Sequence, residues 1–343
     1  MLFLCQMINQ IKSCRAVSLF LVFFLNLPVL FAQSTEGKPE GKIEKLSKEL
    51  DAILDREAKV EVIAGGFGWV EGPLWIESKK MLLVSDVLNN TVYKWTPQKG
   101  KEVYLEYSGY TGEQSRGEEL GSNGLALNHK GQLLLCQHGD RRVALMNASL
   151  DKPKPDYTTL AGEYKGKKFD SPNDLVVKSN GDIYFTDPPY GLEKGANNPS
   201  KAAPYQGVYK ISKNGSVTLL VDTISRPNGI AFFPGEKSLL IANSDGERPY
   251  LYRYDLDKNG LLINGSIFQN DRGVDGIKID KKGNVFTTGQ GGVWIYNKKG
   301  VLLGKIKIEG STSNCAFADN YNTLFITADD YLLKVDLVKK TGL

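Results

Sequence analysis

The chain has 343 residues, of which 41% are hydrophobic and 36 are glycine, and its formal net charge is +4. This length exceeds that of a usual single domain, but a closed architecture of many short strands and tight turns reaches it as one domain. The nearly neutral charge, with no basic run interleaved with aromatic residues, argues against nucleic acid as a partner.

The N-terminus has the features of a secretory signal peptide. Lys12 and Arg15 precede an apolar run over residues 16–32, and the run ends at Ala32, where cleavage is plausible. Loss of residues 1–32 removes two positive charges and lowers the formal charge from +4 to +2. We therefore expect an exported protein, periplasmic or secreted, without membrane attachment after cleavage. The alternative is that the same run remains as an uncleaved anchor.

A linker and a predicted helix follow, over residues 33–58. Residues 33–42 are polar, and the next fifteen residues carry apolar side chains at helical spacing: Ile43, Leu46, Leu50, Ile53 and Leu54. This spacing predicts one amphipathic helix over residues 43–57, packed on the surface of the main domain. The main domain is expected over residues 59–343, and its first strand over residues 60–64.

One short phrase recurs six times in that domain. Each copy has a polar residue with a side-chain oxygen, then a small or polar residue, then an apolar run, and each is followed by a polar turn and a second apolar run. The six leading residues are Glu71, Asn123, Asn173, Asn228, Asp275 and Asn314, which stand 52, 50, 55, 47 and 39 residues apart. A repeat of this length with several short strands predicts a β-propeller, so the fold class is all-β with six blades.

The last repeat is one strand short. Only three apolar runs follow from Asn314 to the end of the chain. Residues 60–64 are free to supply the fourth strand, which would join the two ends of the domain in one sheet and cover an open edge.

The six leading residues are expected to encircle one mouth of the central channel. A second polar residue follows each of them 14 or 15 positions later: Asp86, His138, Asp187, Asn243, Gln290 and Asp329. A hairpin returns both positions to the same rim. The resulting ring of carboxylate and amide oxygens suits a hard cation such as Ca²⁺. The alternative is that Asn and Asp only begin strands after turns.

The phrases resemble those of the gluconolactonase/regucalcin (SMP-30/gluconolactonase-like) superfamily of six-bladed calcium-dependent hydrolases. The resemblance covers approximately residues 65–337, and it rests on Glu71-Gly-Pro, Ser171-Pro-Asn-Asp-Leu, Phe185-Thr-Asp-Pro-Pro-Tyr, Arg226-Pro-Asn-Gly and Val274-Asp-Gly-Ile. The segment Cys136-Gln-His-Gly-Asp-Arg-Arg is similar to the bacterial gluconolactonase branch.

The resemblance implies a catalytic Ca²⁺, or another divalent cation such as Zn²⁺, Mg²⁺ or Mn²⁺, held by Glu71, Asn173, Asn228 and Asp275. It also implies that Asp275 activates water, although the sequence does not distinguish Asp275 from Glu71 in this role. The substrate would be a small sugar-type lactone. Four further residues are expected to contact it: Asn123, His138, Tyr190 and Asn314. For Asn123 and Asn314 the alternative is that they support the residues that hold the cation.

For several of these residues a structural role is an equal alternative. His138 is expected at the mouth, either as a ligand for a sugar hydroxyl or as an ordinary rim residue. Tyr190 is expected either to form a wall for a sugar ring or to lie in a loop that two prolines merely stiffen. Asp187 either caps this loop or meets substrate. Cys136 and Cys315 fall in blades that do not adjoin and are expected to be free thiols.

Three functions fit this sequence. The leading one is lactone hydrolysis by an exported enzyme. A phosphotriesterase-like or promiscuous esterase would use the same cation to polarise a P=O group. A non-catalytic propeller could bind a ligand at the same mouth, because a fold alone implies no reaction.

Overall fold

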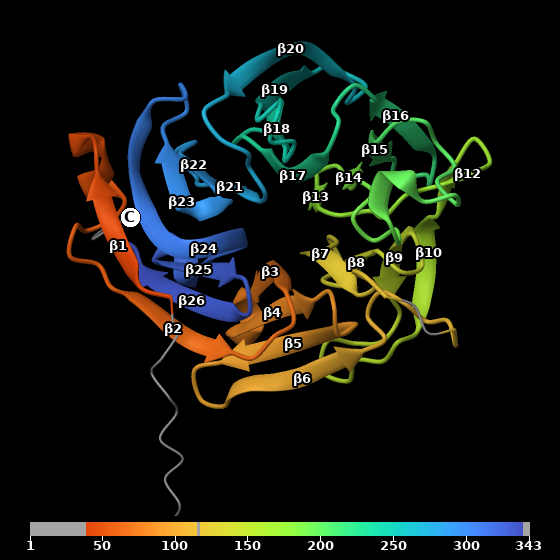
Figure 1. Ribbon diagram of the computed structural model, residues 1–343, viewed down its shortest axis with the longest axis horizontal. Helices are drawn as coiled ribbons and strands as arrows, with labels where there is room; N and C mark the ends of the chain where they lie inside the picture. The colour runs from red at the N-terminus through yellow and green to blue at the C-terminus, as the bar shows by residue number, and fades with distance from the viewer. Residues whose placement is uncertain (1–38, 115–116, 339–343) are drawn as a thin grey trace, which may run out of the picture. The chain divides into compact units, whose positions relative to one another are not determined.

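The computed structural model describes residues 39–114 and 117–338, and these residues form six four-stranded antiparallel sheets around a central axis (Figure 1). Apart from four short 3-10 helices, the regular secondary structure of this part of the chain is β, and it includes no α-helix. This is the arrangement of a six-bladed propeller. The predicted signal peptide, residues 1–32, lies outside the described residues.

The first four sheets each use four consecutive strands. The first sheet contains β3 (Val70–Ile76), β4 (Met81–Asp86), β5 (Thr91–Thr96) and β6 (Gly100–Glu106), and the second contains β7 (Ser122–Leu127), β8 (Leu133–Gln137), β9 (Arg142–Met146) and β10 (Tyr157–Ala161). The third sheet contains β13 (Leu175–Val177), β14 (Ile183–Asp187), β15 (Gly207–Ile211) and β16 (Val217–Val221). The fourth contains β17 (Pro227–Phe232), β18 (Ser238–Asn243), β19 (Leu251–Leu256) and β20 (Leu262–Gln269). A small hairpin of β11 (Glu163–Tyr164) and β12 (Lys167–Lys168) precedes the third sheet.

The fifth and sixth sheets share one long strand, β24 (Leu302–Ala318). Its first part pairs with β23 (Gln290–Tyr296) of the fifth sheet, beyond β22 (Val285–Thr287) and β21 (Ile277–Ile279). Its second part pairs with β25 (Thr323–Ala328), which pairs with β26 (Tyr331–Asp336). The outermost strand of the sixth sheet is β2 (Val60–Gly65), antiparallel to β26 with Val60 opposite Val335. The predicted closure of the ring by residues 60–64 is therefore confirmed.

The predicted amphipathic helix over residues 43–57 is wrong. Residues Gly41–Lys45 form strand β1, which pairs antiparallel with residues 304–308 of β24 and adds a fifth strand to the fifth sheet. A single turn of 3-10 helix, Lys48–Ala52, follows. The strand forms because β24 offers an unpaired edge, and the amides of Leu46 and Ser47 both donate to Leu303 O (3.0 and 2.9 Å), which turns the chain out of the strand.

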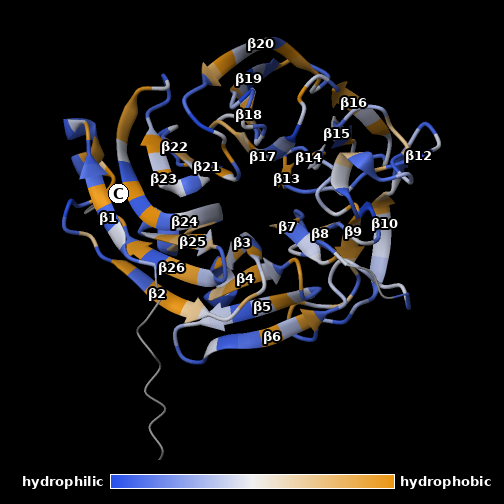
Figure 2. Cartoon of the chain, viewed as in Figure 1, coloured by the Kyte–Doolittle hydropathy of each residue, from blue (hydrophilic) through white to orange (hydrophobic). Residues whose placement is uncertain are grey.

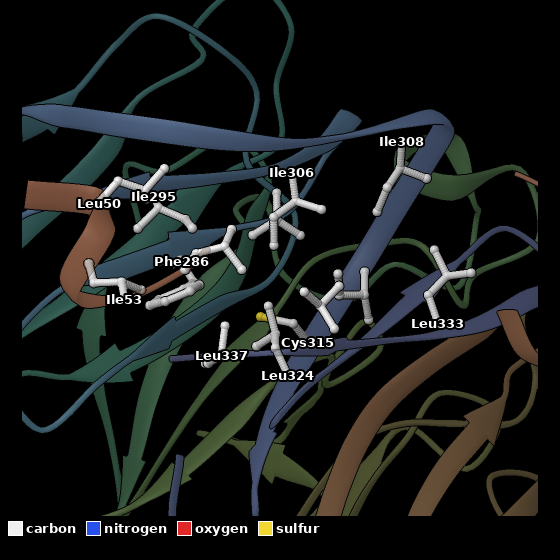
Figure 3. Packing of buried hydrophobic residues seen from close by; sticks show 14 of the residues in the cluster. Leu50, Ile53, Phe286, Ile295, Ile306, Ile308, Cys315, Leu324, Leu333 and Leu337 are labelled. Carbon is white, nitrogen blue, oxygen red and sulfur yellow. The ribbon is translucent and has the colours of Figure 1, made fainter. Parts of the chain in front are cut away.

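The apolar spacing that resembles a helix is satisfied by this strand and turn. Leu50 and Leu54 are fully buried and Ile53 nearly so, among side chains of the fifth and sixth sheets, whereas Leu46 is 51% exposed (Figure 3). A continuous helix would place Leu46 on the same buried face as Leu50, four residues away. The observed exposure of Leu46 shows that Leu46 and Leu50 do not lie on one face of a continuous helix.

The apolar core of the described residues is divided among the six interfaces between adjacent sheets. Hydrophobic positions lie on the strands of all six sheets (Figure 2), and both faces of the inner strands are buried. One buried pair from each interface illustrates this: Leu83 and Leu135, Cys136 and Phe185, Tyr184 and Ile241, Leu240 and Val285, Ile295 and Ile326, and Leu82 and Phe325. Each sheet is therefore held by its two neighbours, as a closed ring requires.

The two cysteines in the described part of the chain, Cys136 and Cys315, are buried and unbridged, as predicted. In this part of the chain we find no helix long and apolar enough to cross a membrane.

Candidate functional site

A circle of hydrogen bonds between adjacent sheets brings the six leading residues together at the centre of the ring. Each bond joins one sheet to a carbonyl at or beside the leading residue of the next sheet. The six bonds are Ser85 Oγ to Asn123 O (2.8 Å), Gly124 N to Asn173 O (2.7 Å), Thr186 Oγ1 to Asn228 O (2.8 Å), Gly229 N to Asp275 O (2.8 Å), Thr288 Oγ1 to Ser313 O (2.7 Å) and Ser313 Oγ to Val70 O (2.6 Å). These contacts occupy the backbone, so the side chains of the leading residues remain for chemistry in the channel.

The glycine after a leading residue allows the sheets to approach this closely. A Cβ atom at Gly72 would lie 2.0 Å from Asn123 O, and one at Gly229 would lie 2.6 Å from Asp275 O. Glycine is therefore needed here because a neighbouring backbone passes where a side chain would stand. The Asn-Gly pairs mark contacts between sheets and not hairpin turns.

Several leading residues are presented by irregular backbone. The pairing register shifts between Glu71 and Leu74 in the first sheet, between Ser122 and Leu125 in the second, and between Pro227 and Ile230 in the fourth. Such bulges bend a strand and redirect a side chain at a ligand site. In the third and fifth sheets the strand begins only after the leading residue, at Leu175 and Ile277.

The two carboxylates of the ring affect each other. Burial raises the pKa of Glu71, which is 4% exposed, and the charge of Asp275 raises it further, although Gly72 N donates to Glu71 Oε2 (3.1 Å). Burial and then the charge of Glu119 raise the pKa of Asp275 to about 8, although the amide of Asn228 donates to it. Both carboxylates are thus held where their ionised forms need a neighbouring positive charge.

The sequence pattern missed a third carboxylate beside this pair, Asp174. It is 4% exposed, its Oδ1 accepts from Leu175 N (2.9 Å), and its Oδ2 accepts from Ile230 N of the next sheet (3.3 Å). The signal in the sequence is that Asp174 occupies the position that is glycine in four of the six phrases. Asp174 joins two innermost strands and adds negative charge near Glu71 and Asp275.

The amide oxygens of the ring differ in their availability. Asn123 Oδ1 is buried and has no hydrogen-bond partner among the described residues. Asn228 Nδ2 donates to Ser244 Oγ (3.0 Å), so this amide turns its NH₂ group toward protein partners. Asn314 Oδ1, in contrast, already accepts from Lys278 Nζ (3.0 Å) and Cys315 N (2.9 Å). The predicted substrate residue Asn314 is therefore engaged with the protein.

These donors fit a hard cation better than a soft one. Across the residues that the structure describes, no group of three or more His, Cys, Asp or Glu side chains is arranged to hold a metal ion. The ring instead combines two carboxylates with neutral amides, and Ca²⁺ accepts amide oxygens beside a few carboxylates. The raised pKa values of Glu71 and Asp275, and the buried oxygen of Asn123 without a hydrogen-bond partner among the described residues, fit a site that binds a cation.

The second polar position of most repeats has a structural role. In four sheets its oxygen accepts from a backbone amide of the segment that precedes the leading residue: Asp86 from Gly68 (2.9 Å), Asp187 from Asp170 (2.9 Å) and Ser171 (2.8 Å), Asn243 from Arg226 (2.9 Å), and Asp329 from Ser311 (3.2 Å). Asp187 is therefore a loop cap. Burial raises its pKa to about 8.

His138 differs from the other residues at this position. Its side chain has no exposed surface. Its Nδ1 lies 3.3 Å from Glu119 Oε2, and within the described residues neither ring nitrogen forms a hydrogen bond of standard geometry. The sequence pattern also missed Glu119.

Tyr190 lies in a loop that is fixed at both ends. Ser171 Oγ donates to Pro188 O (2.6 Å) and accepts from Gly191 N (2.8 Å), while the Tyr190 hydroxyl and Ser244 form a hydrogen bond. Ser244 Oγ in turn donates to Val274 O (2.8 Å). This chain of contacts links the loop after the third sheet to the backbone beside Asp275, and burial raises the pKa of Tyr190.

Comparison with known proteins agrees with this fold. The profile of the SMP-30/Gluconolactonase/LRE-like region matches residues 69–330. A gluconolactonase of Zymomonas mobilis is 38% identical over 313 residues, which are 87% of each chain. The lactonase drp35 of Staphylococcus aureus (strain USA300) is 25% identical over 325 residues, covering 89% of this chain and 91% of the relative.

Solved structures give the same result. A gluconolactonase from Xanthomonas campestris superposes with a TM-score of 0.74 at 29% identity, over 87% of this chain and 95% of the other. The calcium-binding protein regucalcin from Agrobacterium tumefaciens superposes with a TM-score of 0.63 at 18% identity, over 80% of this chain and 93% of the other, and shows the fold alone. The chain belongs to the SMP-30/gluconolactonase/LRE-like family.

Proposed function

We propose that this protein is an exported, calcium-dependent lactone hydrolase that acts on sugar-type lactones. The proposal rests on the ring of oxygen donors, in which Glu71 and Asp275 lie among asparagines. Hydrogen bonds between adjacent sheets hold the backbone of this ring in place. The gluconolactonase and lactonase relatives support the choice of substrate. The apolar run at residues 16–32 supports export to the periplasm or the medium.

In this proposal the cation is held by Glu71, Asn173, Asn228 and Asp275, with Zn²⁺, Mg²⁺ or Mn²⁺ as substitutes for Ca²⁺. A bound cation supplies Lewis-acid polarisation of the lactone carbonyl and stabilises the developing oxyanion. Asp275 accepts a proton from the attacking water. Asn228 orients Asp275 by donating to it, and Ser244 holds the Asn228 amide in place.

The test is proton release from glucono-δ-lactone by the purified protein, measured with EDTA and after calcium is restored. EDTA should abolish turnover and lower the melting temperature, and calcium should restore both. Calcium at 100 times its dissociation constant stabilises the folded state by about 2.7 kcal/mol. If EDTA changes neither quantity, calcium has no role in this site.

Two substitutions separate the roles of the carboxylates. Asp275→Asn keeps an oxygen for the cation but cannot accept a proton, so turnover at saturating calcium should fall about 10²–10⁴-fold while calcium still raises the melting temperature. Glu71→Gln should weaken calcium binding, and high calcium should partly restore its rate. Asp222→Asn, the same change at an exposed position outside the ring, is the control. If Asp275→Asn keeps wild-type turnover, Asp275 is only a ligand and Glu71 becomes the candidate base.

A further inference from the structure

Glu119 stands beside the ring without belonging to it. It lies in the loop between β6 and β7, four residues before Asn123, and its side chain is 31% exposed. After burial, its charge is the next cause of the raised pKa of Asp275, so the two carboxylates lie within electrostatic reach of each other. One of its oxygens, Oε2, lies 3.3 Å from His138 Nδ1.

His138, which directly follows β8 of the second sheet, is placed to hold Glu119. At the equivalent position, the first, third, fourth and sixth sheets use an oxygen to hold the backbone of the segment before the leading residue. His138 instead presents a ring nitrogen to a side-chain carboxylate of the segment before Asn123. Its ring is confined, because a Cβ atom at Gly191 would lie 2.5 Å from His138 Cβ. A confined imidazole whose Nδ1 can donate orients a partly exposed carboxylate.

The second sheet therefore offers a buried acceptor that lacks a donor. Asn123 Oδ1 is buried and has no hydrogen-bond partner among the described residues, while the Glu119 side chain is 31% exposed and can reach a ligand from the loop. Buried acceptors are normally paired, so an unpaired acceptor at a channel mouth indicates a ligand that donates. Hydroxyl groups on a sugar ring are such donors, whereas an unsubstituted lactone ring carries no O–H or N–H group.

We propose that Glu119, positioned by the buried His138, binds the hydroxyl groups of the substrate together with Asn123 and selects polyhydroxylated lactones over unsubstituted ones. This inference rests on the proposed lactone hydrolysis and names its substrate class. Glu119 touches the substrate, whereas His138 acts through Glu119 and is a positioning residue.

The experiment compares kcat/KM for glucono-δ-lactone and for δ-valerolactone, which has the same ring without hydroxyl groups. Glu119→Ala should lower the ratio of the two values about 10- to 100-fold, mainly through a higher KM for the hydroxylated lactone, because hydrogen bonds to a charged group are worth this much. Glu119→Gln, which keeps an acceptor oxygen, should recover part of the ratio. Glu113→Ala, at an exposed position in the same loop, should leave the ratio at the wild-type value.

The role of His138 is tested in a double-mutant cycle. His138→Gln should lower the same ratio in the wild-type background and change it less than twofold in Glu119→Ala, because it acts through the carboxylate. A purely structural histidine would lower turnover of both lactones in both backgrounds. Thermal melts show whether each variant folds, and His138→Asn replaces His138→Gln if that variant does not fold.

A binding measurement keeps the inference independent of turnover. Calorimetry with 1,5-anhydroglucitol, which has the hydroxylated ring without the carbonyl, should show about 10- to 100-fold weaker binding to Glu119→Ala than to the wild type. If the wild type hydrolyses neither lactone, the proposed function fails while this binding still tests Glu119. An unchanged affinity, or an equal loss of kcat/KM for both lactones in Glu119→Ala, overturns the inference.

Discussion

Leu50→Ala tests the packing of the N-terminal segment, where the expectation from sequence and the structure disagree. Leu50 lies in the 3-10 turn Lys48–Ala52 and has no exposed surface. It packs directly on β24, because a Cβ atom at Gly304 would lie 2.6 Å from Leu50 Cδ2. The alanine variant should therefore leave a cavity in the core between the fifth and sixth sheets.

The expected loss follows from this burial. Removal of a fully buried leucine costs about 2–5 kcal/mol, including the cavity that remains. We expect about 3 kcal/mol for Leu50→Ala, and a fall in melting temperature of about 6 °C, since 1 kcal/mol shifts the melting temperature of a domain of this size by about 2 °C. Leu46→Ala, at a side chain that is 51% exposed, should change stability by less than about 0.5 kcal/mol.

Urea denaturation of the two variants, followed by tryptophan fluorescence, measures both free energies. The slope of the unfolding free energy against urea should match that of the wild type, which shows that the denatured state is unchanged. An amphipathic helix would bury Leu46 and Leu50 on one face and make the two losses similar. Equal losses, or a loss below about 1 kcal/mol for Leu50→Ala, would refute the packing described here.

Three further predictions concern buried groups. Burial raises the pKa of the Cys136 and Cys315 thiols, that of Cys315 to about 12, so at pH 8 neither should react with a thiol reagent until the protein is unfolded in urea. Gly229→Ala should lower the free energy of unfolding by about 1–3 kcal/mol and weaken the stabilisation by calcium, because the new Cβ atom meets Asp275 O. Melting temperatures equal to those of the wild type, with and without calcium, would contradict this prediction. Burial raises the pKa of Asp187 to about 8, above its value of about 3.9 in the unfolded chain. The folded state therefore binds this proton more tightly than the unfolded state does. As a result, the free energy of unfolding should fall as pH rises from about 4 to 8. Asp187→Asn should lessen that fall in urea titrations at pH 5, 6, 7 and 8, and an equal fall in both proteins would show that Asp187 is already ionised.

The repeated phrase by itself determined the all-β class, the six repeats and the residues at the centre. It did so because a strand that lines a narrow channel needs the same residue types in every sheet: an oxygen-bearing side chain, a small neighbour and an apolar run. The shortage of one strand after Asn314 likewise determined that residues 60–64 close the ring, since an open edge would leave backbone groups unpaired.

Tertiary structure alone decided the form of residues 41–54 and the partners of the polar residues. Apolar spacing at Ile43, Leu50 and Leu54 is compatible with either a helix or a strand and turn, and the free edge of β24 favoured the strand. Asp174 stands at a fixed position of the repeated phrase, but Glu119 carries no periodic signal that marks it as a neighbour of Asp275. Its approach depends on where a loop returns in space, which spacing along a chain does not encode.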